Sequence, residues 1–155
     1  MEIMRRIAAF TLVEIMIVVA IIALLVVMAL PSFLRARQHA QNAKYVNALR
    51  IAVDAFQMYA TENNTYPADV NRAVVPPGMA LYFGPTLDWT KPTPIGGNWD
   101  WDYNVYGFKA GVSVVGSSAD VAQMTEIDAK IDDGNLSTGS FQNTASDRYT
   151  SIIEP

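Results

Sequence analysis

Cysteine is absent from the 155-residue sequence, and histidine occurs only once, at His39. The lack of cysteine excludes disulfide bonds, thiolate metal sites and cysteine nucleophiles, but it leaves the cellular compartment open. The sequence also lacks a Gly-x-Ser-x-Gly elbow, a phosphate-binding glycine loop and a His-Glu-x-x-His zinc motif. His39 itself is expected on a solvated helix face. The sequence therefore predicts a protein that is not an enzyme and needs no cofactor for catalysis.

Basic residues are scarce in the larger, second part of the chain. Up to Arg50 there are six basic and two acidic side chains, whereas from Ile51 onward there are five basic and thirteen acidic ones. An acidic bulk repels phosphate backbones, so the electrostatic field of a nucleic-acid-binding protein is missing. We therefore expect no nucleic-acid partner.

Charge is absent from the twenty positions between Ile15 and Leu34, which are mostly apolar. At a rise of ~1.5 Å per residue, a helix of this length covers about 30 Å, the thickness of a bilayer's hydrocarbon core. The run predicts a membrane-spanning helix in preference to the buried helix of a soluble protein. Arg5 and Arg6 precede it and Arg35 and Arg37 follow it, so the positive-inside rule does not decide its orientation.

A cleaved secretory signal is the alternative interpretation of this segment. The run is longer than the usual signal-peptide core of about 7–15 residues, and no Ala-x-Ala cleavage site follows it. We therefore favour a helix that is retained in the protein. Glu14 stands at its edge, where an unpaired carboxylate is costly and indicates a partner.

The sequence Phe10-Thr11-Leu12-Val13-Glu14 follows a short basic leader and precedes the apolar run with Pro31. This N-terminus resembles that of type IV pilins and type II secretion pseudopilins. The resemblance implies a leader peptide at residues 1–9, which a prepilin peptidase removes by cutting between Ala9 and Phe10 before it methylates the new amine. The leader of that family normally ends in glycine, and Ala9 is a small enough replacement for cleavage to continue, although more slowly.

The resemblance also gives roles to Glu14 and Pro31. In the family, the glutamate pairs with the N-terminal ammonium of a neighbouring subunit, so Glu14 is expected to neutralise the amine of Phe10 during filament assembly. Either charge alone is costly in an apolar core, while the pair is tolerable. The alternative is a glutamate that only reaches the lipid headgroups from a plain membrane anchor. Pro31 lies within the helix, where it deletes a backbone hydrogen bond and favours a kink or a local melting.

The resemblance implies a structural subunit held in the bacterial inner membrane with its head outside the cytoplasm. Residues 10–35 then form the membrane and filament-core half of a long helix, and residues 36–155 form the periplasmic or extracellular head. The implied partners are other copies of the chain in a helical filament, the prepilin peptidase, the inner-membrane assembly platform and membrane lipid. Type IVa pilins usually close their C-terminal region with a disulfide, so the lack of cysteine favours a pseudopilin. The alternative function is a single-pass membrane protein with an aromatic, glycan-binding head.

The rest of the chain predicts an α+β head. The helix is expected to run from Phe10 to about Glu62 and to stop at Asn63-Asn64, with a buried stripe formed by Val46, Leu49, Val53, Phe56 and Ala60. An irregular segment follows, because five prolines fall between Ala73 and Pro94. Four antiparallel strands and a short helix complete the head, which is packed on the helix in the pilin-like ladle architecture. The strands are expected at 99–105, 110–115, 140–142 and 149–153, and the short helix at 121 to about 134, after Ser117-Ser118-Ala119-Asp120.

The first strand alternates, with Trp99, Trp101, Tyr103 and Val105 on one face and Asp100, Asp102 and Asn104 on the other, which predicts a half-buried strand. Its aromatic residues, with Trp89, Tyr82 and Tyr106, are interpreted as core in preference to a carbohydrate-stacking surface.

Four oxygen-bearing residues cluster near the end of the short helix: Asp128, Asp132, Asp133 and Asn135. We favour a solvated helix end for this cluster, with a calcium site as the alternative. Calcium requires six to eight oxygen ligands, usually from a loop.

Overall fold

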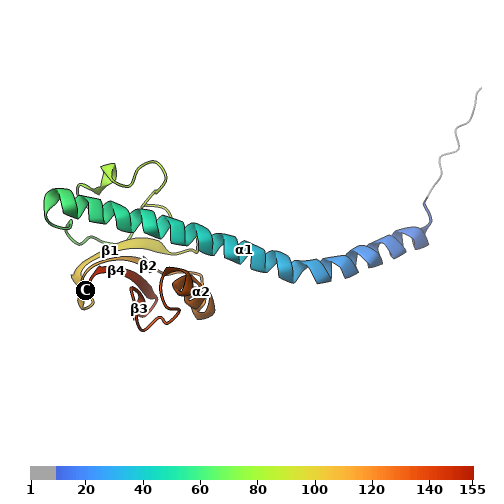
Figure 1. Cartoon of the computed structure of the whole chain (residues 1–155). Coiled ribbons are helices and arrows are strands. Elements are labelled where there is room, and N and C mark those ends of the chain that lie inside the picture. Colours follow the sequence, from blue (N-terminus) through green and yellow to red (C-terminus); the bar gives the residue numbers. More distant parts are fainter. Residues whose placement is uncertain (1–9) are drawn as a thin grey trace, which may run out of the picture. The chain divides into compact units, whose positions relative to one another are not determined.

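The computed structural model describes residues 10–155 of the chain, and the predicted leader, residues 1–9, lies outside the described residues. The contacts divide the chain into two compact parts between Gln38 and His39. The elements follow in the order α1 (Leu12–Asn63), the 3₁₀ turn η1 (Met79–Leu81), β1 (Asn98–Val105), β2 (Phe108–Val115), α2 (Val121–Ile131), β3 (Phe141–Ala145) and β4 (Arg148–Glu154). The predicted α+β fold, a long N-terminal helix with a small antiparallel sheet, is confirmed (Figure 1).

Helix α1 is one continuous helix, in agreement with the predicted span. It passes through Pro31 without interruption, so the local melting considered there is not observed, and the kink stays a prediction. Asn63 is the last helical residue, and Asn64 adopts a left-handed conformation with a φ of 57°. Asparagine tolerates this conformation better than most residues, which explains why the helix stops here as expected.

The four strands form one antiparallel sheet in the order β1-β2-β4-β3. Tyr106 and Gly107 join β1 to β2, and both have a positive φ, 54° and 88°. A type I′ hairpin turn requires this conformation at its two central residues. Strand β2 consequently begins at Phe108, two residues before the predicted start at Ala110.

The connection between β2 and β3 contains the predicted short helix, α2. Its N-cap is Asp120, whose side chain accepts a hydrogen bond of 2.8 Å from the backbone N–H of Gln123. The helix ends at Ile131, three residues before the predicted stop at Gly134. Strand β3 continues to Ala145, so the last hairpin loop is shorter than expected.

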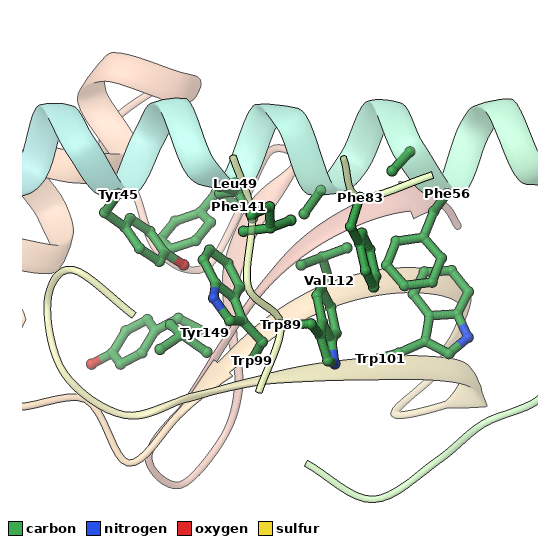
Figure 2. Close-up of a cluster of buried hydrophobic side chains, with 14 of the residues drawn as sticks. Tyr45, Leu49, Phe56, Phe83, Trp89, Trp99, Trp101, Val112, Phe141 and Tyr149 are labelled. Atoms are coloured by element: carbon green, nitrogen blue, oxygen red, sulfur yellow. The ribbon is translucent and has the colours of Figure 1, made fainter. Parts of the chain in front are cut away.

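The core of the head lies between the second half of α1 and the sheet (Figure 1). Tyr45 stacks on Trp99 with ring centroids 5.6 Å apart, and Phe56 stacks on Trp101 at 3.7 Å (Figure 2). The amphipathic half of α1 is therefore packed on the sheet, as predicted.

The buried face of α1 is rotated relative to the predicted stripe. The prediction is correct for Leu49 and Phe56, whereas Val46, Val53 and Ala60 are only half-buried. The buried positions of the helix are Asn42, Tyr45, Leu49, Ala52, Ala55 and Phe56. The periodicity of apolar residues did not reveal this rotation, because the helix is covered by the irregular connection as well as by the sheet.

This connection, from Asn64 to Gly97, has no strand and only the short turn η1, as its prolines predicted. It inserts Phe83 and Trp89 into the core, where their rings stack at 4.9 Å (Figure 2). The three tryptophans, Trp89, Trp99 and Trp101, are at most 2% exposed. Their interpretation as core is confirmed, and they form no carbohydrate-stacking surface. Of the tyrosines interpreted in the same way, Tyr82 and Tyr103 are half-buried, and the interpretation is wrong for Tyr106, which is 52% exposed.

The outer face of β1 contradicts the prediction of a half-buried strand. Asn104 is exposed, but Asp100 and Asp102 are only 5% and 3% exposed. Arg148 of β4 covers them: its Nη1 donates to both carboxylate oxygens of Asp102 at 2.7 and 2.6 Å, and its Nη2 donates to Asp100 at 2.7 Å. The ring of Tyr106 lies 4.5 Å from the guanidinium carbon. An ion-paired layer therefore replaces the expected solvated row.

Hydroxyl groups continue this layer across the sheet. Ser113 of β2 donates to Asp102, and its Oγ lies 2.7 Å from Oγ1 of Thr150 on β4. Thr150 Oγ1 in turn lies 2.7 Å from Oγ1 of Thr144 on β3. One chain of hydrogen bonds thus links all four strands on the face opposite α1.

Candidate functional site

The start of α1 is built around a reciprocal contact between Thr11 and Glu14. The backbone N–H and the hydroxyl of Thr11 both donate to Oε2 of Glu14, each at 2.8 Å. The backbone N–H of Glu14 donates back to the Thr11 hydroxyl at 3.2 Å. This is a capping box, which satisfies N–H groups that have no partner in the first turn of a helix. The Thr-x-x-Glu spacing before an apolar run is the signal that sequence reasoning missed.

The capping box changes the interpretation of Glu14. In a single chain its carboxylate already has a partner, because Thr11 donates hydrogen bonds to one of its two oxygens. Phe10 lies just before the helix with 80% of its surface exposed. The pairing of Glu14 with a neighbour's amine stays a prediction, as does cleavage after Ala9, which lies outside the described residues.

The apolar half of α1 is uncovered along its whole length. Every Val, Ile, Leu, Met and Phe side chain from Phe10 to Leu34 is at least half exposed, between 51% and 80%. By length and composition this helix qualifies as a membrane span, and none of its apolar window is buried in the described chain. Contiguous exposed apolar surface of this kind marks a membrane or protein contact. This half of the helix is therefore not part of the core of the head.

Three carboxylates meet where α2 ends. Asp128, Asp132 and Asp133 each place an oxygen within 4.8 Å of the others. Asp128 is completely buried, and neither of its oxygens has a hydrogen-bond partner within residues 10–155. The predicted solvated helix end is therefore wrong for Asp128, because α2 turns this side chain toward the protein interior.

The loop after α2 shapes the rest of the cluster. Asp133 accepts hydrogen bonds from the backbone N–H of Asn135 at 2.8 Å and from the hydroxyl of Thr138 at 2.7 Å, which lower its pKa. Burial raises the pKa of Asp128, and the charges of Asp133 and Asp132 raise it further. Asn135 directs its side-chain oxygen to the backbone N–H of Ser137. The arrangement could accept a cation at Asp128, Asp132 and Asp133, with Asn135 turned toward its own loop.

Comparisons with known proteins agree with the features at the start of the chain. Residues 4–30 match the prokaryotic N-terminal methylation motif. The chain is 39% identical over 66 residues to the type IV wide pilus major component PilA4 of Thermus thermophilus, which covers 43% of this chain and 50% of that protein. It is 33% identical over 63 residues to the type II secretion system core protein G of Aeromonas hydrophila, covering 41% and 44% of the two chains.

The chain thus spans about half the length of the curated relatives that it matches. No solved structure matched it. The resemblance to pilins and pseudopilins, drawn from Phe10 to Glu14, is confirmed: the methylation motif is present, and the similar proteins come from these two systems.

Proposed function

We propose that this protein is a structural subunit of a type IV pilus-like or type II secretion pseudopilus filament. The observation that carries the proposal is the uncovered apolar half of α1, most of which lies within residues 4–30, the match to the methylation motif. The leader at residues 1–9 is removed by a prepilin peptidase and the amine of Phe10 is methylated. Residues 10–35 then hold the subunit in the inner membrane, and residues 36–155 form the head outside the cytoplasm.

The exposed helix suits both the stored and the assembled subunit. In the bilayer, its side chains from Phe10 to Leu34 are covered by acyl chains; in a filament, the same surfaces are covered by the helices of other copies. Lipid tails and packed leucine or valine side chains are similarly apolar, so the transfer requires no exposure of this surface to water. An inner-membrane assembly platform would move the subunit between the two states.

Glu14 is positioned to specify the register of the filament. Thr11 donates only to Oε2 of Glu14, and within residues 10–155 no donor reaches Oε1. That oxygen is available to the methylated ammonium of Phe10 on a neighbouring copy. A subunit in the wrong register would leave one positive and one partly satisfied negative charge in an apolar core, which is strongly unfavourable.

A non-catalytic role agrees with the similar proteins, whose names describe a pilus component and a secretion-system core protein. The alternative, a membrane-anchored head with an aromatic glycan-binding surface, loses the three tryptophans of that surface because they are in the core, and keeps only the tyrosines Tyr82, Tyr103 and Tyr106. The capping box would serve a plain anchor as well, so the methylation motif as a whole, and not the carboxylate of Glu14 alone, favours the filament. The lack of cysteine favours the pseudopilus among filaments.

The test compares three variants in cells that have the assembly machinery. Glu14→Ala and Glu14→Gln should stay in the membrane and be processed, but filament yield should fall at least tenfold because the amine of Phe10 loses its partner. Thr11→Val is the matched control: it removes the capping hydroxyl, keeps the carboxylate and should assemble nearly normally. Wild-type filament yield from Glu14→Ala would refute the proposal, and an equal loss from Thr11→Val would assign Glu14 to the helix cap alone.

We also propose that the acidic cluster of Asp128, Asp132 and Asp133 binds Ca²⁺. The supporting observation is the buried Asp128, whose two oxygens lack partners among the described residues. Oxygen-rich sites of this kind suit calcium, and bidentate carboxylates supply much of its coordination shell. A bound cation would offset the mutual repulsion of the three carboxylates and fix the loop between α2 and β3.

Thermal unfolding of the full chain in detergent tests this site. Calcium chloride should raise the melting temperature relative to a chelator, because a ligand that binds only the folded state stabilises it. Asp128→Asn and Asp133→Asn should lose this shift, while Asp54→Asn, at an exposed position on α1, should keep it. An identical shift in all the variants would show that calcium acts elsewhere.

A further inference from the structure

A hollow of about 630 Å³ lies where the last turns of α1 meet the following loop and the ends of β1, β2 and β4. Gln57 and Thr61 of α1 form one side, Asn64 and Tyr66 the loop side, and Tyr103, Lys109 and Glu154 the strand side. The volume falls within the range of small-molecule pockets, about 300–1,000 Å³. The filament proposal does not use this groove, which belongs entirely to the head.

The aromatic wall of the groove is fixed from behind. The ring of Tyr66 lies 5.6 Å from the buried Trp101 and 6.2 Å from Tyr103. The indole N–H of Trp101 donates to the carbonyl of Pro67 at 3.0 Å, which ties down the residue after Tyr66. The backbone N–H of Tyr103 donates to Asp69 at 3.2 Å, which holds the same loop against β1. Both rings are therefore positioned before any ligand arrives.

The polar wall offers donors and acceptors without a net charge. Lys109 Nζ lies 2.6 Å from Oε1 of Glu154, so the two charges cancel. The side-chain amides of Gln57 and Asn64 each offer an N–H donor and a carbonyl acceptor. The phenol of Tyr66 is protonated at neutral pH, because the ordinary pKa of tyrosine is about 10, and it can donate a hydrogen bond as well as accept one.

We propose that this groove binds a neutral saccharide. A pyranose ring has apolar C–H faces that pack on aromatic rings, and hydroxyl groups that both donate and accept hydrogen bonds. The rings of Tyr66 and Tyr103 can pack on the C–H faces of the sugar. The side-chain amides of the groove and its Lys109–Glu154 ion pair can donate to and accept from the hydroxyl groups. An ionic ligand fits less well, because Lys109 and Glu154 already neutralise each other. Of the aromatic residues first considered as a carbohydrate-stacking surface, this groove contains only Tyr103, and its occupancy does not depend on filament assembly.

The experiment uses the full chain in lipid nanodiscs, because maltoside detergents would themselves supply sugar. Glucose, N-acetylglucosamine and cellobiose are titrated to about 50 mM, a range that includes millimolar dissociation constants. Saturation-transfer NMR reports contact with the sugar, and the fluorescence of the three buried tryptophans reports on the core behind Tyr66, which includes Trp101. We expect a saturable response to at least one of the three, and no response to sodium acetate or ammonium chloride.

Variants locate the site and separate binding from folding. Tyr66→Ala should weaken binding at least tenfold, Tyr66→Phe should retain most of it, and Lys109→Gln should weaken it severalfold. Tyr82→Ala is the matched control, because Tyr82 lies near the same end of α1 beside Glu62 and does not line the groove. Each variant must melt cooperatively, which shows that it is folded. If Tyr66→Ala does not fold, the proposal is tested by the other two variants: Tyr66→Phe should bind sugar nearly as well as wild type, and Lys109→Gln should bind it severalfold more weakly.

No saturable response to any of the sugars would overturn the proposal, as would unchanged binding by a folded Tyr66→Ala. Equal loss in Tyr82→Ala would also overturn it, since the effect would then lie outside the groove. Tyr66→Ala is expected to assemble like wild type, whereas Glu14→Ala is expected to bind sugar like wild type. Failure of the groove and failure of the filament proposal are therefore distinguishable.

Discussion

Arg148 on β4 binds both carboxylate oxygens of Asp102 on β1, at 2.7 and 2.6 Å, although β2 lies between the two strands. The two residues are 46 positions apart in the chain. Their contact passes over Ser113 of β2, which donates to the same aspartate. The pair therefore joins the first hairpin of the sheet to the last, on the face that α1 does not cover.

Removal of this arginine should destabilise the head strongly. We expect Arg148→Met to lower the free energy of unfolding by about 3–5 kcal/mol, because Asp100 and Asp102 would stay buried without their cation. Lys109→Met is the control, since the Lys109–Glu154 pair is nearly half exposed and such pairs contribute at most about 1 kcal/mol. Urea unfolding of the full chain in detergent measures both. A similarly small loss in the free energy of unfolding for Arg148→Met and Lys109→Met would contradict a structural role for Arg148.

The stability of the head should depend on pH through Asp128. Its pKa is raised in the folded protein, chiefly by burial, above the ordinary value of about 3.9. Such a group favours folding at low pH, and this contribution is lost as the pH rises through the raised pKa. In a chelator, Asp128→Asn should therefore melt above wild type near neutral pH, and the difference should shrink as the pH falls through the raised pKa of Asp128 and be nearly gone below about 4. The exposed Asp54→Asn should show no such trend, and a wild-type profile for Asp128→Asn would exclude the effect.

The mature chain should begin at methylated Phe10. Intact-mass measurement of protein purified from cells with an active prepilin peptidase should give a chain lacking residues 1–9 and carrying one methyl group. Ala9→Gly should leave or improve processing, and a bulky residue at this position should block it. An unmodified chain that begins at Met1 would contradict the prediction.

The second half of α1 should be required for folding of the head. A fragment of residues 36–155 should be soluble and melt cooperatively, because it keeps the aromatic contacts of Tyr45 and Phe56. A fragment of residues 63–155 should aggregate. Each large apolar side chain that loses burial costs about 1.5–3 kcal/mol. Several such losses together are comparable to a domain's net stability of about 5–15 kcal/mol. Equally sharp melts for the two fragments would show that the helix is not part of the core.

The sequence alone determined the features of this protein that depend on neighbouring residues. The uncharged run from Ile15 to Leu34, the helix stop at Asn63-Asn64 and the irregular proline-rich segment all follow from local composition and backbone preference. The motif from Phe10 to Glu14 was enough to indicate the class of protein, because its five residues are consecutive in the sequence. Even the cap between Thr11 and Glu14 could have been predicted from their spacing.

Only the tertiary structure decided which faces of the head are buried. Alternation along β1 correctly separated Trp101 from Asp102, but it did not reveal that Arg148, from the far end of the chain, covers the acidic face. The same holds for Tyr45, which is buried because Trp99 stacks on it, and for Asp128, which is enclosed with no hydrogen-bond partner among the described residues. Periodicity reports the polarity of each face of a strand or helix, while burial depends on segments that are distant in sequence and meet only when the chain folds.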